Sequence, residues 1–207
     1  MKRFAKVLLT PLLVVAVSTA FGQSFEGTIE FTKTHGKVST TYRYYVKGDW
    51  VRIEEIGDEG EVYGIQLVDT KNQKVWGLSP EKEMYMEVVP KSEPADPNTT
   101  IEESKIFVTM HDRKCKEYIV TCAEEETVID YYVTEGNFDF FVPLLKTIKR
   151  KDKQAVYYLE LAMNDGQFPV KSVEKKKDGT EVSVLEVTEI TEEELDDSLF
   201  EIPEGYR

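Results

Sequence analysis

The sequence has few of the residues on which most enzymes and metal sites depend. Its 207 residues include only two histidines and two cysteines, so metal sites and nucleophile–base pairs have little to draw on. No Gly-x-Ser-x-Gly elbow, His-Glu-x-x-His motif, phosphate-binding glycine loop or calcium loop is present. His35 and His111 lie beside Gly36 and Asp112 in predicted turns. We therefore expect no catalytic residue, no metal site and no cofactor, and a protein that is not an enzyme.

Positive charge is also scarce. The chain has 26 Lys and Arg against 39 Asp and Glu, a formal net charge of -13. Nucleic-acid binding needs a basic face, so we expect no nucleic-acid partner. Carboxylates are numerous enough to include a glycosidase-like acid pair, but runs such as 124–126 and 192–194 are typical of solvated surfaces.

Long hydrophobic runs are missing as well. A membrane-spanning helix needs ~20 apolar residues, whereas the apolar run over residues 7–17 is interrupted by Thr10 and Pro11. The later apolar runs are shorter and alternate with polar residues. The sequence therefore predicts a protein that does not span the membrane.

The first 22 residues have the features of a secretory signal peptide. Three basic residues precede the apolar run, and Ala20 and Gly22 put small side chains at the -3 and -1 positions of a cleavage site. We expect cleavage between Gly22 and Gln23, which leaves one domain over residues 23–207. Neither cysteine lies near that site, so we expect an exported protein, periplasmic or extracellular, without a lipid anchor.

The two cysteines lie on one predicted strand. Between Cys115 and Cys122 there is no Gly, Pro, Asn or Asp, and seven strand steps span ~23 Å with an odd spacing that directs the side chains to opposite faces. A disulfide needs Cα atoms within ~6.8 Å. We predict two structural thiols rather than a disulfide or a reactive pair.

Alternation with a period of two dominates the sequence after residue 24. Phe25, Gly27, Ile29 and Phe31 fall on one face of a strand, and polar residues fall on the other. Turn residues separate similar runs at regular intervals, and Asp178-Gly179 favours a hairpin with a type I′ turn. This pattern predicts an antiparallel sheet.

Two segments have helical features. Residues 137–150 carry apolar residues at helical spacing, with Asn137 as a candidate N-cap and Pro143 in the first turn. Thr191 and Glu194 match a capping box, which predicts a helical turn over 191–195. The expected fold class is α+β and mostly β: one curved antiparallel sheet with one or two short helices, arranged as a half-barrel or an open sandwich.

The order of several short motifs carries a family resemblance. They are Asp69-Thr70 before Lys74-Val75-Trp76, residues 80–85, the strand of Cys115 and Tyr118, Gly166-Gln167-Phe168-Pro169-Val170-Lys171, the Asp178-Gly179 hairpin, and the ending over 195–206. Together they resemble the outer-membrane lipoprotein-sorting (LolA/LolB-like) superfamily, with the exported family called domain of unknown function 4412 as the nearest branch. His111-Asp112-Arg113 departs from the pattern, because a glycine is expected before the Cys115 strand.

The resemblance implies a sheet of about eight to eleven strands in an unclosed barrel, with helices on its concave side. In the lipoprotein carriers that side is apolar and holds acyl chains. Two sets of residues are therefore candidates for an apolar cavity or for the plug that fills it. They are Phe138, Phe140, Phe141, Leu144, Leu145 and Ile148 on the predicted helix, and Met84 and Met86 on a predicted strand.

Two functions remain open from the sequence. In the first, the protein is an exported envelope binding protein that holds a lipid, an acylated protein or another apolar ligand in its half-barrel. In the second, it is a non-catalytic structural or protein-interaction module with a self-filled barrel and an envelope protein as partner. An open apolar cavity of ~300 Å³ or more would favour the first.

Overall fold

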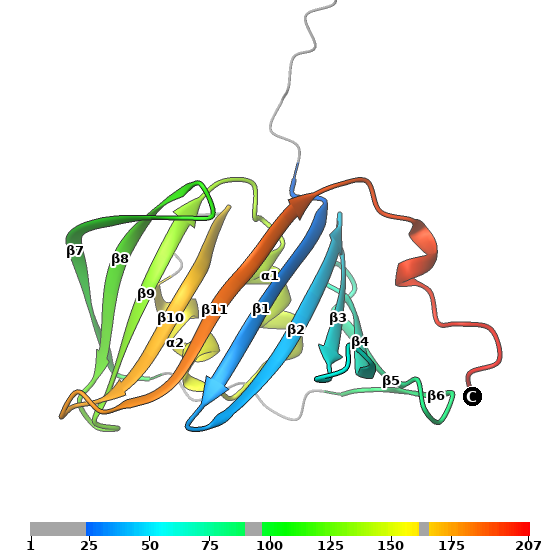
Figure 1. Ribbon diagram of the computed structural model, residues 1–207, viewed down its shortest axis with the longest axis horizontal. Helices are drawn as coiled ribbons and strands as arrows, with labels where there is room; N and C mark the ends of the chain where they lie inside the picture. The colour runs from blue at the N-terminus through cyan, green and yellow to red at the C-terminus, as the bar shows by residue number, and fades with distance from the viewer. Residues whose placement is uncertain (1–23, 90–96, 162–165) are drawn as a thin grey trace, which may run out of the picture.

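A computed structural model describes residues 24–89, 97–161 and 166–207. The described residues form one antiparallel sheet of eleven strands with two α-helices (Figure 1). The strands are β1 (Gly27–His35), β2 (Val38–Lys47), β3 (Trp50–Ile56), β4 (Val62–Asp69), β5 (Lys74–Ser79), β6 (Met84–Glu87), β7 (Thr99–Met110), β8 (Arg113–Cys122), β9 (Thr127–Glu135), β10 (Gln167–Lys176) and β11 (Glu181–Glu192).

The sheet is curved and does not close. Its strand order is β6-β5-β4-β3-β2-β1-β11-β10-β9-β8-β7, so β6 and β7 are the two edges. The first and last strands meet in the middle, where β1 pairs with β11 from Gly27 opposite Glu192 to His35 opposite Ser183. This pairing joins a wing of β1–β6 to a wing of β7–β11. The predicted fold class, a mostly β unclosed sheet with short helices, is confirmed.

Both helices lie on the concave side of the sheet (Figure 1). They are α1 (Phe141–Ile148) and α2 (Lys153–Leu161). The prediction that α1 begins at Asn137 is wrong: Phe140 is the N-cap and makes no side-chain cap, while the Asn137 carbonyl accepts a hydrogen bond from the Phe25 amide at 2.8 Å. Pro143 lies in the first turn of α1, as predicted.

The predicted helical turn over 191–195 is also wrong. Strand β11 runs to Glu192, and the Glu193 amide extends the ladder by donating to the Glu26 carbonyl at 3.2 Å. A 3-10 helix follows instead at Asp197–Phe200, where the Asp196 carboxylate accepts from the Ser198 amide at 2.8 Å. The chain stays extended because pairing with β1 satisfies backbone groups that a helical turn would leave to a cap.

Two hairpins differ in detail from their predicted turns. The β10–β11 hairpin forms at Asp178-Gly179, but Asp178 is absent from the residues with positive φ and only Gly179, at 86°, adopts it. The turn is therefore not type I′. Between β7 and β8, His111 and Asp112 both adopt positive φ, at 48° and 57°. They make the turn for which a glycine was expected.

An aromatic core fills the space between the sheet and the helices. The ring of Phe168 on β10 lies 4.9 Å from the ring of Phe138 and 4.7 Å from that of Phe141, measured between centroids. Phe25 stacks on Phe138 at 5.2 Å. The chain approaching α1, α1 itself and the middle strands thus share one buried cluster.

A smaller apolar cluster lies on the convex side. Ile65, Leu67 and Leu78 are buried there against Ile202 and Tyr206 of the C-terminal segment. That segment is held at its start by Arg52 and Lys47, which donate to the carbonyls of Leu199 and Leu195 at 3.1 and 2.6 Å. The C-terminal segment therefore covers the outside of β4 and β5.

Both cysteines lie on β8, as predicted, and both are buried free thiols. Burial raises the pKa of the Cys115 thiol, which keeps that sulfur protonated and unreactive.

In the described ranges no helix is both long enough and apolar enough to cross a bilayer. The predicted signal peptide, with its cleavage site at Gly22 and Gln23, lies outside the described residues.

Replacing Leu144 with alanine should lower the free energy of unfolding by about 2–5 kcal/mol, because Leu144 is fully buried and its loss leaves a cavity. Urea denaturation followed by circular dichroism measures the change. Val38→Ala, at a position 68% exposed, is the control and should change stability by less than about 0.5 kcal/mol. Equal effects of the two substitutions would contradict the packing of α1 on the sheet.

Stability should also fall in alkali. Burial raises the pKa values of Tyr131 and Tyr158 well above the ordinary value of 10.0. Above pH 10 the unfolded chain loses these protons while the folded protein keeps them, so the free energy of unfolding decreases by up to about 1.4 kcal/mol per pH unit for each group. Urea midpoints at pH 8 and pH 11 test this. Tyr158→Phe should make the decrease smaller, and an unchanged pH dependence would contradict the burial of this hydroxyl.

Candidate functional site

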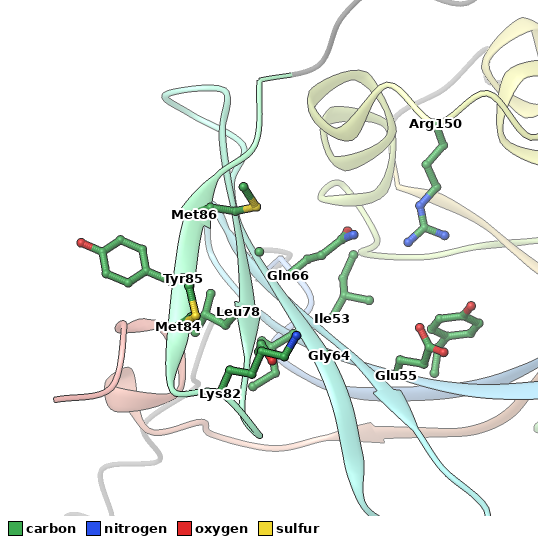
Figure 2. Close-up of a pocket in the computed structure, with 14 residues that line it drawn as sticks. Ile53, Glu55, Gly64, Gln66, Leu78, Lys82, Met84, Tyr85, Met86 and Arg150 are labelled. Atoms are coloured by element: carbon green, nitrogen blue, oxygen red, sulfur yellow. The ribbon is translucent and has the colours of Figure 1, made fainter. Parts of the chain in front are cut away.

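A groove with a volume of about 420 Å³ lies on the concave side, over β2–β6. Figure 2 shows it between β6 on one side and the segment that follows α1 on the other. Its volume falls in the range of small-molecule sites, ~300–1,000 Å³. The groove is therefore the candidate binding site of the described residues.

Strand register forms the floor of the groove. Ile53 on β3 pairs with Gln66 on β4, Gln66 pairs with Gly77 on β5, and Gly77 pairs with Met86 on β6. A second row contains Glu55 opposite Gly64. Directly paired residues point to the same face of a sheet, so all of these positions face the concave side.

Two glycines make the floor hollow. A Cβ atom at Gly64 would meet nothing within 4 Å, and one at Gly77 would meet only Cγ2 of Val88 at 3.5 Å. Neither glycine has the positive φ that would require this residue. Gly64 and Gly77 therefore serve by having no side chain. The groove is deeper over them than over the bulky residues of the neighbouring strands.

Methionines form one wall. Met84 and Met86 on β6 are 48% and 67% exposed, and Figure 2 shows Met86 projecting into the groove while Tyr85 points away from it. Thioether side chains are flexible and adapt to irregular apolar partners. Such exposed apolar groups on a groove wall are available to a ligand.

Three charged side chains also line the groove: Arg150, Lys82 and Glu55. Helix α1 ends at Lys149, whose left-handed conformation (φ 46°, ψ 48°) redirects the chain. Figure 2 shows Arg150 extending from there toward the strands. Burial raises the pKa of Tyr42, a fourth lining residue, and the charge of Glu55 adds to the effect, so that phenol stays neutral.

The structure separates the two predicted sets of site residues. The helix set is part of the core, where all but Ile148 are buried and Ile148 packs against the cluster: Phe138, Phe140, Phe141, Leu144, Leu145 and Ile148. Met84 and Met86 instead line the groove. The helix residues thus occupy one part of the concave side, and the methionines border the part that is left open.

Sequence reasoning missed Gly64, Gly77 and Arg150. The two glycines carried a signal, because a glycine inside a strand often marks a place that another group approaches closely. Arg150 carried none, since its position depends on the left-handed turn at Lys149.

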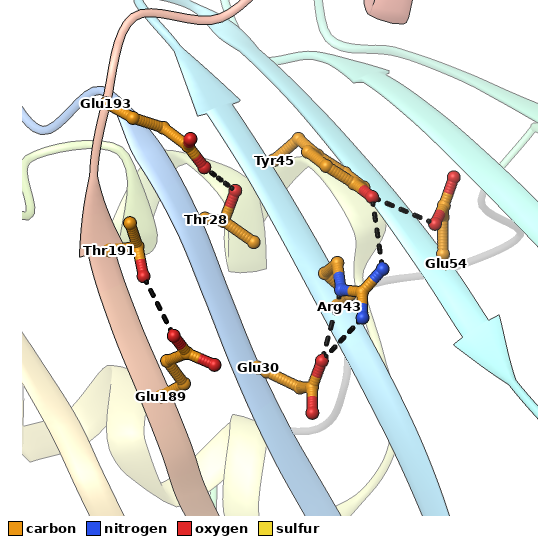
Figure 3. A network of polar contacts seen from close by, with 8 residues as sticks. All are labelled: Thr28, Glu30, Arg43, Tyr45, Glu54, Glu189, Thr191 and Glu193. Atoms are coloured by element: carbon orange, nitrogen blue, oxygen red, sulfur yellow. Dashed lines mark hydrogen bonds and ion pairs between the residues drawn. The ribbon is translucent and has the colours of Figure 1, made fainter. Parts of the chain in front are cut away.

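The convex side carries a network of polar contacts (Figure 3). Arg43 binds the Glu30 carboxylate at 2.8 Å and donates to the Tyr45 hydroxyl at 3.4 Å, and Tyr45 donates to Glu54 at 3.3 Å. These residues lie on the paired strands β1, β2 and β3 and satisfy one another's hydrogen-bonding groups.

Across the described part of the chain no group of three or more His, Cys, Asp or Glu is placed to hold a metal ion.

Comparison with known proteins gives one family and several similar folds. The model of the family described as domain of unknown function 4412 matches residues 25–206. None of the curated proteins matches the sequence. The solved structure of an uncharacterized conserved protein from Thermus thermophilus is similar with a TM-score of 0.50 and 12% identity, over 88% of this chain and 91% of that one. At that identity the likeness concerns the fold alone.

Two further structures are more distant. PNGF-II is similar at 15% identity over 87% of this chain but only 30% of its own, with a TM-score of 0.48. A domain from Vibrio parahaemolyticus, provisionally assigned to outer-membrane lipoprotein sorting, is similar at 9% identity over 84% of this chain and 87% of its own, with a TM-score of 0.32.

Gly64→Ala should raise the free energy of unfolding by about 0.5–1 kcal/mol, because alanine loses less backbone freedom in a strand and its methyl group enters open space. Urea denaturation measures the change. Gly27→Ala is the contrast: its Cβ would lie 2.0 Å from the Thr191 carbonyl oxygen, and its φ is 147°, so stability should fall. Destabilisation by Gly64→Ala would mean that the floor is not open.

Proposed function

The chain belongs to the family called domain of unknown function 4412, and we propose that it is an exported, non-catalytic envelope protein that binds an acyl chain of a lipid or an acylated protein. The observation that carries this proposal is the groove of about 420 Å³ on the concave side, bordered by Met84 and Met86. Its volume exceeds the ~300 Å³ at which a binding function is favoured over a self-filled barrel.

Burial of apolar surface would supply the binding energy. Each Å² of apolar surface removed from water contributes ~25 cal/mol. An acyl chain laid over Gly64 and Gly77 would bury its own methylene groups together with the exposed side chains of Met84 and Met86. An acyl chain needs no hydrogen bonds from the floor and would lie over Ile53, Gly64 and Gly77, beside the polar side chains of Gln66 and Glu55.

The predicted location agrees with this ligand class. The basic and apolar segments of residues 1–22 predict export. An exported protein of this kind meets the lipids and acylated proteins of the envelope.

A protein-interaction function is the second candidate, and edge strand β7 favours it. Ile101, Ile106 and Phe107 on β7 are each at least 40% exposed, and an edge strand offers unpaired backbone groups to a partner strand. An envelope protein that adds a strand at β7 would leave the groove free, so the two functions are separable by mutation.

Displacement of a fluorescent fatty acid tests the acyl-binding proposal. The purified protein should bind the probe and release it to laurate, and Gly64→Leu should weaken binding at least tenfold because its side chain fills the floor. Tyr63→Leu is the matched control: it places a leucine one residue earlier on β4, at a position that is 61% exposed and outside the groove lining, and should bind normally. Failure of the unmodified protein to bind, or equal binding by Gly64→Leu, would overturn the proposal.

A further inference from the structure

Arg150 is a half-buried cation without an ion pair. In the part of the chain that the structure describes, no carboxylate lies within 4 Å of its guanidinium group and no side chain or carbonyl accepts a hydrogen bond from it. This is unusual in a chain with 13 more acidic than basic residues, because surface arginines in such a chain have many carboxylates to pair with. Arg150 therefore keeps donors that a ligand could use.

Arg150 lies where two cavities meet. It lines the groove and also a second, inner cavity of about 50 Å³ between the sheet and the helices. Tyr42 borders both as well. The terminal group of a ligand that extends from the groove toward the inner cavity would therefore lie next to the Arg150 guanidinium group.

The inner cavity contains buried polar groups that lack a protein partner. The hydroxyl of Tyr158, 1% exposed, and Oε1 of Gln154, 5% exposed, both belong to residues that line it, and neither atom finds a hydrogen-bond partner among the described residues. Leaving such an atom unpaired costs roughly 1–3 kcal/mol. Burial holds the pKa of Tyr158 well above its ordinary value, so its hydroxyl keeps its proton and can donate.

The other charges near Arg150 are few. Glu55 faces it across the groove, and Asp152 lines the inner cavity but pairs with Lys33 at 3.5 Å and accepts from the Ala155 amide at 3.2 Å. Lys82 adds a second cation to the groove. The groove thus has a formal charge of +1 on a protein whose net charge is -13, and this local excess favours an anion.

We propose that the groove selects an anionic single-chain amphiphile, with its acyl chain on the floor beside Met86 and its carboxylate or phosphate at Arg150, beside Tyr42. The inference rests on the proposed function and names the ligand's head group. A guanidinium group suits this role because its planar set of donors matches the two oxygens of a carboxylate or phosphate. Partial burial strengthens the contact by reducing screening.

Calorimetric titration with three ligands of equal chain length tests the selection: laurate, lauryl phosphate and lauryl alcohol. Hydrogen bonds to a charged group are worth about 1.5–3 kcal/mol, so at least one of the anions should bind about tenfold or more tightly than the alcohol. Comparing the two anions distinguishes a carboxylate from a phosphate as the preferred head group. Higher salt should reduce the difference between anion and alcohol.

Arg150→Met should remove most of the preference for the anion while leaving the affinity for lauryl alcohol within about twofold, because the chain-binding floor is unchanged. Lys37→Met removes the same charge from an exposed hairpin position outside the groove and should keep the full preference.

The outcomes separate the two proposals. Binding of neither the anions nor the alcohol would overturn acyl binding itself. Equal binding of laurate, lauryl phosphate and lauryl alcohol, or an undiminished preference in Arg150→Met, would overturn the head-group assignment and leave acyl binding standing.

Discussion

The concave face of the sheet is much wider than the helices that pack on it, and the groove follows from this difference. Eleven strands at ~4.8 Å spacing extend about 48 Å along the arc. Helices α1 and α2, of 8 and 9 residues, are only about 12 and 14 Å long. Helix α1 packs against β4 and β5, and α2 packs against β7. Two helices of this size cover only part of the arc: Val51, Val68 and Val75 belong to the buried core, while the part of β2–β6 around Gly64 and Gly77 stays open as the groove.

Side-chain size then decides how each part of the concave face is used. Under the helices, Phe168 and its aromatic neighbours fill the space that the curvature creates. Beyond the end of α1, Gly64 and Gly77 leave that space open, and the convex side of the same strands is sealed by the C-terminal segment. Packing of the C-terminal segment on the convex side of β4 and β5 therefore stabilises these strands, so their concave side can keep an open groove. Arg150 stands at the border between the filled part and the open part.

The sequence predicted those features that depend on local pattern. Alternation around Ile29 and Phe31 identified the buried face of β1, and the apolar residues of α1 were found although its start was misplaced, because Phe140 offers no capping side chain. Helix α2 was missed, although the Asp152 carboxylate before it accepts from the Ala155 amide at 3.2 Å and caps it, since no clear helical period follows Asp152. The groove depends on register between distant strands, such as Gln66 opposite Gly77, and no local pattern determines such a pairing.

The central claim is that the groove over β2–β6 holds an acyl chain. Native mass spectrometry of the protein recovered from cell envelopes without detergent tests this claim most directly. The expected spectrum shows the chain together with one bound acyl-bearing molecule, and the bound species disappears on collisional activation and is absent from Gly64→Leu. A spectrum with only the ligand-free mass, unchanged after incubation with laurate, would contradict the claim and would leave strand addition at β7 as the better explanation of the fold.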